Sequence, residues 1–352
     1  CGSYPPLFNA EHFREWLAAC FTHFAINSGL FCPICYQRKP IRYGHNPQGT
    51  QRLQCRICRK VWTPRQPPLT TIDPPEQIVT VPLIVPFQGA SADQKLYVLL
   101  SFDAIRGNIL HISSNFTPHS IGESLVYRWR GIVEATAKHD DVIQRVNQRE
   151  TQFLRRSQFD EIQYGSAMLK RNASGEILRP VITAHGHFRV LRHLWPTIKM
   201  HIIAHECFLR GAVITAWAEQ FRENHASLWF VDEEMGDDQH TRPWQLLGKS
   251  YQGWWQNQWQ IWQQGNRRKM VCLLTEGQVE KGASITLRAS HHFIAWLQQQ
   301  PEFRDSARYS AHAVFQTIRT LTEKYNILIT QSDLPGGAAA SRAYGSCHSQ
   351  AG

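Results

Sequence analysis

The spacing of apolar and polar positions changes along the chain, and each periodicity predicts a helix or a strand. Apolar residues recur at helical spacing over 8–29, which ends at a Ser-Gly stop, so we expect a helix there. The segments IVTVPLIVPF and KLYVLLSFDAIRGNILHISSNF predict strands, and the second is expected to form a hairpin that turns at Arg106-Gly107-Asn108. A helical pattern follows from about residue 120 to residue 156, with a break expected near residues 139–141.

From residue 157 onward, short apolar runs surround one long helical pattern. SQFDEIQYGS, GEILRPVITAHG and KMHIIAHECF predict three strands, LRGAVITAWAEQFRENH predicts a helix, and ASLWFVDEE predicts a buried strand that ends in acidic residues. This order indicates an α/β protein with a mixed sheet. Residues 244–264 place Trp255, Trp259 and Trp262 on one face of an expected helix, which we interpret as a packing face or as a base-stacking platform.

The composition favours a globular protein that binds a polyanion. The chain has 352 residues, 42% of them apolar, and a formal net charge of +10, and no run of about 18 apolar residues predicts a membrane span. Charge alone does not choose among DNA, RNA and lipid headgroups. Nine cysteines in a chain of this length do not resemble a secreted disulfide framework, so we expect a reducing, cytoplasmic location. Because the chain begins at Cys1 rather than Met, we expect that the native N-terminus is missing, and the alternative is a Cys1 that is lipidated after processing.

Four cysteines form the strongest motif in the sequence. Cys32, Cys35, Cys55 and Cys58 have the spacing C-x2-C-x19-C-x2-C, at which two thiolate pairs can close a tetrahedral zinc site. A redox role would need one Cys-x-x-Cys pair that enters a helix, so the presence of two pairs favours structural zinc.

Basic residues surround this motif, and no acidic residue lies among them. Between residues 36 and 66 there is no Asp or Glu, and three aromatic residues are interleaved with the cations. The eight cations are Arg38, Lys39, Arg42, Arg52, Arg56, Arg59, Lys60 and Arg65. Such a run is often only a solvated face, but on a metal-held scaffold it favours contact with a phosphate backbone. Arg128 and Arg130 are further candidates, in a segment that could be the last helix of a helix-turn-helix or an ordinary packing helix.

Two acidic residues suggest a cation site. Asp160 lies in the middle of the strand QFDEIQ, where a charge is costly unless a cation compensates it, and Asp232 ends the apolar run SLWFV. If two central strands bring these carboxylates together, a divalent metal would remove their repulsion and position water and a phosphate oxygen. The plainer interpretation of DEEMGDD is a solvated acidic loop or a helix N-cap.

These segments, taken in order, resemble bacterial insertion-sequence transposases that carry a zinc ribbon ahead of a DDE, ribonuclease-H-like domain. CPIC…GTQRLQCRICRKVWTP is similar to that family's ribbon, FDEIQYG to its first catalytic strand, LWFVDEE to the place of its second Asp, EGQVEKGASITLRASHHF to the helix of its third acid, and LTEKYNILI to its closing segment. The resemblance covers roughly residues 30–66 and 157–330. The expected organisation is a helix over 1–30, the ribbon over 31–66, a linker, hairpin and helical DNA-binding region over 67–156, the catalytic domain over 157–330 and a disordered tail over 331–352.

The resemblance implies a DNA transposase that cuts and joins DNA at the ends of its element. Asp160, Asp232 and Glu280 would bind two magnesium or manganese ions that activate water, and later a 3′-hydroxyl, for attack on phosphodiesters. Glu161 matches the second member of the family's Asp-Glu pair, and Arg288 matches an Arg that could hold a phosphate. The implied partners are double-stranded DNA and at least one further copy of the chain, with a location at the nucleoid.

The chain also departs from the family pattern. The Asn that the family has shortly after its Glu is replaced in EKGAS, where Gly282 also lowers helix propensity. Strands are expected over residues 78–116, where the family has a helix-turn-helix, and Glu233 or Glu234 could replace Asp232 as the ligand. A non-catalytic zinc-ribbon DNA-binding protein, such as a regulator descended from a transposase, is therefore the second hypothesis. Convergence of the three acids on one metal pair would favour the enzyme, whereas salt bridges to arginines would favour the binding protein.

Two rival assignments place the chemistry elsewhere. Asp103 could be the first acid and Asp160 the second, although the later strand series is then unexplained. His201 and His205, with Glu206 adjacent, could bind a catalytic zinc if they lay on a helix. KMHIIAHEC predicts a strand instead, in which residues four apart are separated by about 13 Å, too far for one zinc ion.

Overall fold

The computed structural model describes a large sheet, its covering helices and most of a small ribbon. The described residues are 32, 40–47, 51–63, 74–88, 95–117, 141–155, 176–177, 180–235, 243–252, 257–275, 282–305 and 308–332. The predicted helix over 8–29, the predicted strand SQFDEIQYGS, residues 120–140 and all but the first two residues of the predicted tail lie outside these ranges.

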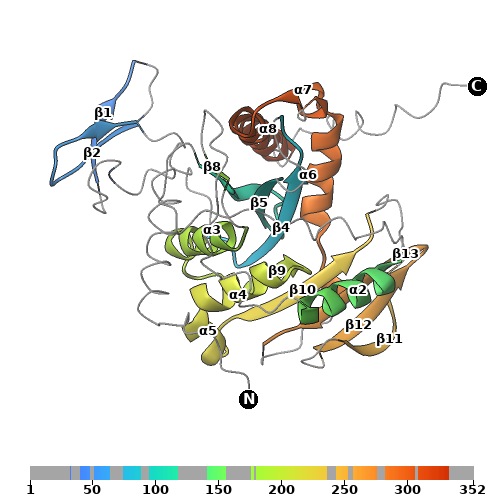
Figure 1. Cartoon of the computed structure of the whole chain (residues 1–352). Coiled ribbons are helices and arrows are strands. Elements are labelled where there is room, and N and C mark those ends of the chain that lie inside the picture. Colours follow the sequence, from blue (N-terminus) through green and yellow to red (C-terminus); the bar gives the residue numbers. More distant parts are fainter. Residues whose placement is uncertain are drawn as a thin grey trace, which may run out of the picture.

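An eight-stranded mixed sheet forms the centre of the fold (Figure 1). Its strands, in spatial order, are β11 (Gln245–Gln252), β12 (Asn257–Gln264), β13 (Arg267–Leu273), β10 (Ser227–Glu233), β9 (Met200–Ala204), β4 (Gln77–Val85), β5 (Leu96–Asp103) and β6 (Ile109–Ser114). β4, β9 and β10 run parallel to one another, and the other neighbouring pairs are antiparallel. The prediction of an α/β protein with a mixed sheet is confirmed.

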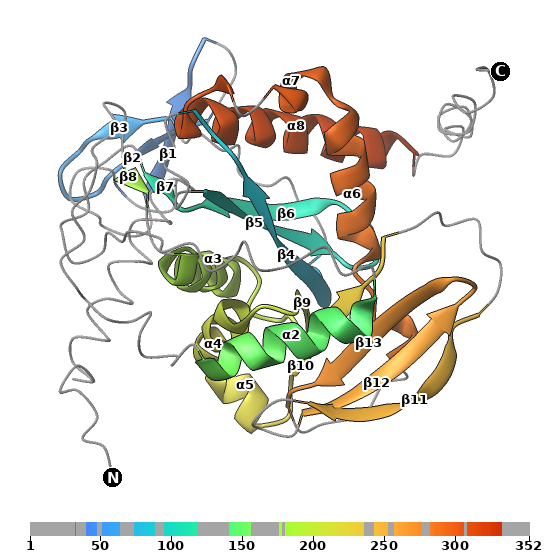
Figure 2. The ribbon, with the colours of Figure 1, turned by 45° about the vertical axis from the view of Figure 1, so that its right-hand side comes forward.

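Helices cover both faces of this sheet (Figure 2). One face carries α2 (Val142–Arg155), α3 (Pro180–Leu194), α4 (Cys207–Ala216) and α5 (Ala218–Arg222), and the other carries α6 (Arg288–Gln299), α7 (Pro301–Arg304) and α8 (Ala311–Ser332). Side chains of β10 alternate between the faces, because Leu228 and Phe230 pack with α2–α4 whereas Trp229 and Val231 pack with α6 and α8. No helix in the described ranges is long and apolar enough to cross a membrane.

The hairpin predicted over residues 95–116 is confirmed. β5 and β6 are joined by a turn in which Gly107 has a φ of 78°, a left-handed conformation that glycine adopts without strain. Asp103 Oδ1 accepts hydrogen bonds from the backbone N–H groups of Ile105 and Arg106 at 2.8 and 2.9 Å. These bonds give Asp103 a structural role at the start of the turn.

One of the predicted strands is wrong. GEILRPVITAHG forms only the short strand β8 (Glu176–Ile177), which pairs with β7 (Phe116–Thr117), before α3 begins at Pro180. Proline suits the first turn of a helix, where its missing N–H has no partner to lose. Ala184, Phe188 and Leu191 are all fully buried, and this spacing of four and then three residues fits one face of a helix but not one face of a strand.

The helix predicted over residues 244–264 is also wrong, because this segment forms β11 and β12. Trp259 and Trp262 therefore belong to opposite faces of the sheet. Trp259 is fully buried and lies parallel to Phe230, with ring centroids 6.2 Å apart. The packing interpretation is thus confirmed for Trp259.

Of the series predicted from residue 157, KMHIIAHECF and ASLWFVDEE form the predicted strands β9 and β10, and the helix predicted between them forms α4 and α5. β4, β5 and β6 are followed by α2 and α3, then β9, α4, α5 and β10. Strands from both sides of the boundary predicted at residue 157 belong to one sheet, so this boundary does not separate two sheets. β10, which carries Asp232, has β9 and β13 as its two neighbours.

Candidate functional site

Three cysteines of the ribbon converge on one point. The ribbon sheet consists of β1 (Ile41–His45), β2 (Gln51–Gln54) and β3 (Val61–Trp62). The Sγ atoms of Cys32, Cys55 and Cys58 all lie within 4.8 Å of one another, and those of Cys32 and Cys58 are 3.4 Å apart. Thiolates that share a tetrahedral ion at about 2.3 Å have similar separations. The cluster can therefore hold a metal ion; Cys35, the fourth predicted ligand, lies outside the described residues.

Backbone hydrogen bonds shape the loop that carries Cys55 and Cys58. The N–H of Ile57 donates to Cys55 Sγ at 3.3 Å, and the N–H of Cys55 donates to the Lys60 carbonyl at 2.9 Å. Arg59 adopts a left-handed φ of 61° within this loop. An N–H that points at the sulfur stabilises the thiolate, which is the form that binds a cation.

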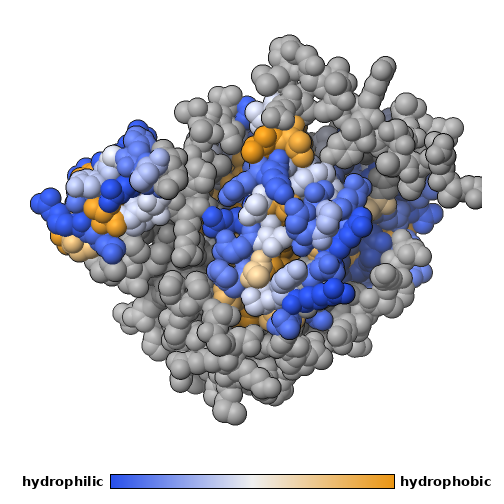
Figure 3. Space-filling view, turned by 90° about the horizontal axis from the view of Figure 1, so that it is seen from above, coloured by the Kyte–Doolittle hydropathy of each residue, from blue (hydrophilic) through white to orange (hydrophobic). Residues whose placement is uncertain are grey.

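The described part of the ribbon presents cations and no acidic residue. Arg42, Arg56, Arg59 and Lys60 are exposed, and the half-buried Arg52 places its guanidinium 5.7 Å from the centroid of the Tyr43 ring. Figure 3 shows the ribbon as a mostly hydrophilic lobe at the left, with a small apolar patch. The other predicted DNA contacts are Arg288, which is exposed at the first residue of α6, and Arg38, Lys39, Arg128 and Arg130, which lie outside the described residues.

A second polar cluster lies at the carboxyl ends of the parallel strands β9 and β10. β10 ends with Asp232 and Glu233, and His205 directly follows β9. Asp232 reaches α2 on one face of the sheet, whereas Glu233 reaches the segment before α6 on the other face. Open α/β sheets bind their ligands beyond the carboxyl ends of parallel strands, which makes this edge the natural candidate site.

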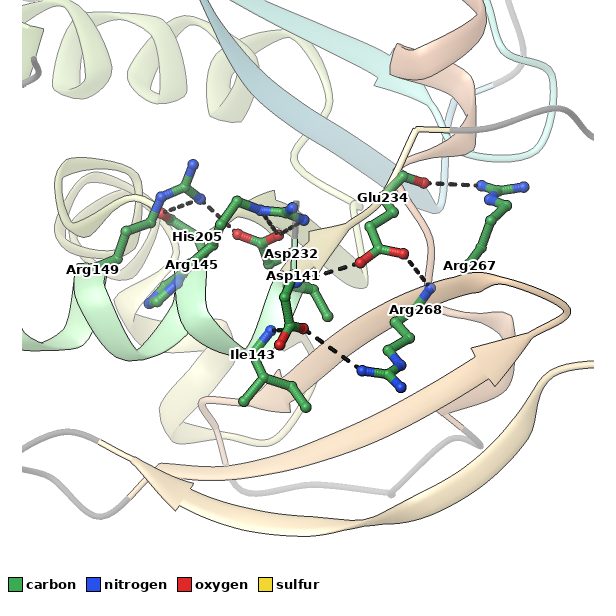
Figure 4. A network of polar contacts seen from close by, with 10 residues as sticks. Asp141, Ile143, Arg145, Arg149, His205, Asp232, Glu234, Arg267 and Arg268 are labelled. Atoms are coloured by element: carbon green, nitrogen blue, oxygen red, sulfur yellow. Dashed lines mark hydrogen bonds and ion pairs between the residues drawn. The ribbon is translucent and has the colours of Figure 1, made fainter. Parts of the chain in front are cut away.

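Asp232 is buried, with a side chain 4% exposed, and two arginines of α2 hold it (Figure 4). Arg145 donates to Oδ1 from Nε at 3.0 Å and from Nη2 at 2.7 Å, and Arg149 donates to Oδ2 from Nη1 at 2.9 Å. Both carboxylate oxygens thus have arginine partners. A charge buried in a strand needs such compensation, and here the protein itself supplies the cations.

Further contacts fix α2 on the sheet edge. Glu234 accepts hydrogen bonds from the N–H of Val142, at the start of α2, at 3.3 Å and from the N–H of Arg268, on β13, at 2.7 Å. Farther along α2, Glu150 Oε1 and His205 Nε2 lie 2.9 Å apart, and both side chains are buried. α2 is thereby tied to the ends of β9, β10 and β13.

Glu233 organises the opposite face of the sheet. Its Oε2 accepts hydrogen bonds from Thr286 Oγ1 at 2.6 Å and from the N–H of Leu287 at 2.7 Å, and Arg267 Nη2 lies 3.3 Å from its Oε1. This carboxylate therefore anchors the chain just before α6. Of the acids at the end of β10, it is Glu233 and not Asp232 that faces this segment, which follows the position of Glu280.

The fully buried Lys269 holds the same segment. Its Nζ donates to the carbonyls of Ala283 and Ile285 at 2.7 and 2.6 Å and lies 4.4 Å from the centroid of the Trp244 ring. Burial lowers the pKa of Lys269 to about 8, and the nearby Glu233 carboxylate partly opposes this shift. The carbonyl partners explain how a lysine is accommodated in the interior.

Of the predicted catalytic acids, only Asp232 lies among the residues that the structure describes. Asp232 lies in the site described above, whereas Asp160, Glu161 and Glu280 lie outside the described residues. Within the described ranges, the ribbon cysteines form the one group of His, Cys, Asp and Glu side chains with metal-binding geometry. Asp232 is thus held by arginines rather than by a cluster of acids.

Asp103 and the histidines of β9 do not form a site with Asp232. Asp103 pairs with the start of β4, at the other end of the sheet, so its Cα lies roughly 20 Å from that of Asp232. His201 is fully buried against Trp217, with ring centroids 4.2 Å apart, and burial lowers its pKa to about 3. β9 is the strand predicted there, so His201 and His205 do not share a zinc ion.

None of the sequence motifs described above includes Arg145, Arg149 or Lys269. A signal exists for the first two, because they lie four residues apart on α2 and alternate with the buried Val142 and Val146. This spacing places both arginines beside the face of the helix that packs on the sheet. Nothing in the local pattern marks Lys269, whose carbonyl partners come from a separate segment.

Comparison with known proteins does not assign the chain to a family. No protein-family model matches the chain, and no curated protein matches it.

Proposed function

We propose that this chain is a DNA-binding protein that grips the phosphate backbone through a zinc ribbon. The observation that carries the proposal is a metal-type cysteine cluster in the same ribbon as the exposed Arg42, Arg56, Arg59 and Lys60, with no acidic residue in the described part of this ribbon. Each cation set against a phosphate releases a condensed counterion, which supplies most of the affinity for DNA. Zinc is the proposed ion because thiolate ligands at this sequence spacing favour it.

The sheet edge supports a binding role over a cutting role. Both oxygens of Asp232 accept hydrogen bonds from arginines, and Glu233 and Glu234 accept bonds from backbone N–H groups. A divalent cation at Asp232 would have to displace two guanidinium groups from a buried carboxylate. Salt bridges to arginine are the arrangement that favours the non-catalytic hypothesis.

A DDE transposase is the second candidate function. Three antiparallel strands followed by two parallel strands with helices between them support a ribonuclease-H-like domain, and acidic residues gather at the carboxyl ends of β9 and β10. Asp160, Asp232 and Glu280 would then hold magnesium or manganese, and the chemistry supplied there would be activation of water and of a 3′-hydroxyl. This function requires Arg145 and Arg149 to release Asp232.

Binding of a fluorescently labelled DNA duplex tests the first proposal. Arg56→Gln, Arg59→Gln and Lys60→Gln, combined in one ribbon variant, should weaken binding at least about tenfold. The matched control removes three exposed cations elsewhere, with Arg222→Gln, Arg304→Gln and Arg308→Gln. Equal affinities of the ribbon variant and the control variant would refute a role for the ribbon in DNA contact.

Cleavage and joining assays distinguish the second candidate. If the chain is an enzyme, DNA fragments incubated with magnesium or manganese should give products with the unchanged protein and none with Asp232→Asn. Binding of both proteins to the fragments without any products would leave the binding function as the account of this chain.

A further inference from the structure

One face of the ribbon sheet combines an open aromatic ring with a cation. β1 and β2 are antiparallel with Arg42 opposite Leu53, so the next residues along, Tyr43 and Arg52, share the opposite face of the sheet. The Arg52 guanidinium lies 5.7 Å from the centroid of the Tyr43 ring, which is the range of a cation–π contact. Tyr43 is nevertheless 47% exposed, so solvent or a ligand reaches this ring.

Hydrogen bonds fix the two strands that carry this pair. The side-chain amide of Gln51 donates to the Gly44 carbonyl at 2.7 Å and to the Arg52 carbonyl at 2.8 Å. Gly44, directly after Tyr43, has a left-handed φ of 64°, which glycine adopts without strain. β3 pairs with the other edge of β2. A ligand that stacks on Tyr43 therefore meets a ring whose backbone is already ordered, which lowers the entropic cost of binding.

The chemistry of this face suits a base of DNA. The described part of the ribbon has several cations and no acidic residue, so it attracts a polyanion. Every base has a π-face that can stack on an aromatic ring, and an arginine beside the ring adds a cation–π contribution. Bases in a duplex are already stacked and paired inside the double helix. A ring on the surface of the ribbon can therefore stack only on an unpaired base.

We propose that Tyr43 and Arg52 form a stacking site for an unpaired base, through which the ribbon binds single-stranded DNA. The inference rests on the proposed DNA-binding function and names the form of DNA that this face recognises. The cations of the ribbon contact phosphates in single strands and duplexes alike, whereas the Tyr43 ring adds affinity for single strands alone.

Variants of the full chain test this inference by binding to a labelled single strand and to the duplex of the same sequence. Tyr43→Leu keeps an apolar side chain but removes the π-face, and Tyr43→Phe keeps the ring. Tyr309→Leu is the matched control, because Tyr309 is 50% exposed and lies outside the ribbon. Thermal unfolding and metal content of each variant show whether its fold and its ribbon are intact.

The inference predicts an effect on one form of DNA only. Tyr43→Leu should bind the single strand about tenfold more weakly than Tyr309→Leu does, and the two variants should bind the duplex equally. Tyr43→Phe should bind both forms as the unchanged chain does. The salt dependence should stay the same in all three variants, because none of them changes a charge. Equal binding of the single strand by Tyr43→Leu and Tyr309→Leu, or an equal loss on both forms of DNA, would overturn the stacking site.

Cross-linking tests the contact in the unchanged chain, without any substitution. A single strand that carries 5-iodouracil is bound and irradiated, and the cross-linked peptides are identified by mass spectrometry. A base stacked on Tyr43 should cross-link to this residue, in the segment 43–52. Cross-links that all lie elsewhere in the chain would overturn the inference.

The ribbon variant separates failure of this inference from failure of the proposed function. Weakened duplex binding by the ribbon variant, together with equal single-strand binding by Tyr43→Leu and Tyr309→Leu, would refute the stacking site alone. Unchanged binding by the ribbon variant, together with weakened single-strand binding by Tyr43→Leu, would refute the phosphate contacts of the ribbon and keep the stacking site.

Discussion

Removal of the Asp232 carboxylate should destabilise the fold by an amount that its two arginines determine. In Asp232→Ala, three hydrogen bonds of 2.7–3.0 Å are lost, and Arg145 and Arg149 remain side by side with like charges. Loss of one partner of a buried ion pair costs about 3–5 kcal/mol. The arginine side chains are 22% and 34% exposed and regain some water, so we expect the lower end, about 3 kcal/mol.

Asp232→Asn separates the effect of charge from the effect of shape. The amide keeps the volume of the side chain and one accepting oxygen, so its cost should be about 1.5 kcal/mol, smaller than that of Asp232→Ala. Glu223→Ala is the surface control, because the Glu223 side chain is 59% exposed and its removal should change stability by less than about 0.5 kcal/mol.

Urea unfolding followed by tryptophan fluorescence measures these differences. Trp229 and Trp259, two of the twelve tryptophans of the chain, are buried in the sheet, so the total emission should change when the sheet unfolds. A loss of about 3 kcal/mol should also lower Tm by about 6 °C. If Asp232→Ala is as stable as Glu223→Ala, the arginines do not hold Asp232 in solution, and this carboxylate would be available to a metal ion.

Three further predictions concern the ribbon, the core and the segment before α6. Cys55→Ser, or a strong chelator, should release the bound metal and abolish DNA binding without shifting the main unfolding transition; metal content and DNA affinity that stay unchanged would contradict the site. Burial lowers the pKa of His201 to about 3, so between pH 6.5 and 3 this histidine is protonated in the unfolded chain but not in the folded chain. The free energy of unfolding therefore falls as the pH drops through this window. Between pH 7 and pH 5, the free energy of unfolding of His201→Leu should therefore fall by about 2 kcal/mol less than that of the unchanged chain. An equal fall in both proteins would show that His201 is not buried in its neutral form. A Cβ at Gly282 would collide with the side chain of Gln260 and lie 2.8 Å from Val271 Cγ2, so Gly282→Ala should cost about 1–3 kcal/mol in urea unfolding; an unchanged midpoint would show that the neighbouring side chains give way.

Local patterns predict the parts of the fold that local forces decide. The β5–β6 hairpin follows from strands rich in apolar residues around Gly107, and the ribbon site follows from the spacing of its cysteines. The strand predicted at GEILRPVITAHG is wrong because the apolar residues of α3 also fit a short buried strand, and only their packing on the sheet decides between the two. β11 and β12 are missed because a spacing of three to four between tryptophans also fits a helix face.

The sequence predicts one residue of the candidate site, Asp232, but not the arginines that bind it. An acid at the end of an apolar strand indicates that Asp232 needs a compensating cation. The partners that compensate it, Arg145 and Arg149, are 87 and 83 positions away and depend on how α2 packs. Gly282, which the local pattern marks only as lowering helix propensity, is explained by its close approach to side chains of β12 and β13.

The salt dependence of DNA binding tests the central claim most directly. The equilibrium constant for a labelled duplex should be measured from low to physiological salt with the unchanged chain, the ribbon variant Arg56→Gln/Arg59→Gln/Lys60→Gln and the control variant Arg222→Gln/Arg304→Gln/Arg308→Gln. The slope of log K against log salt should be smaller by about 2.7 in the ribbon variant than in the unchanged chain and nearly unchanged in the control. Equal slopes for the ribbon and control variants would contradict the proposal that the ribbon grips DNA.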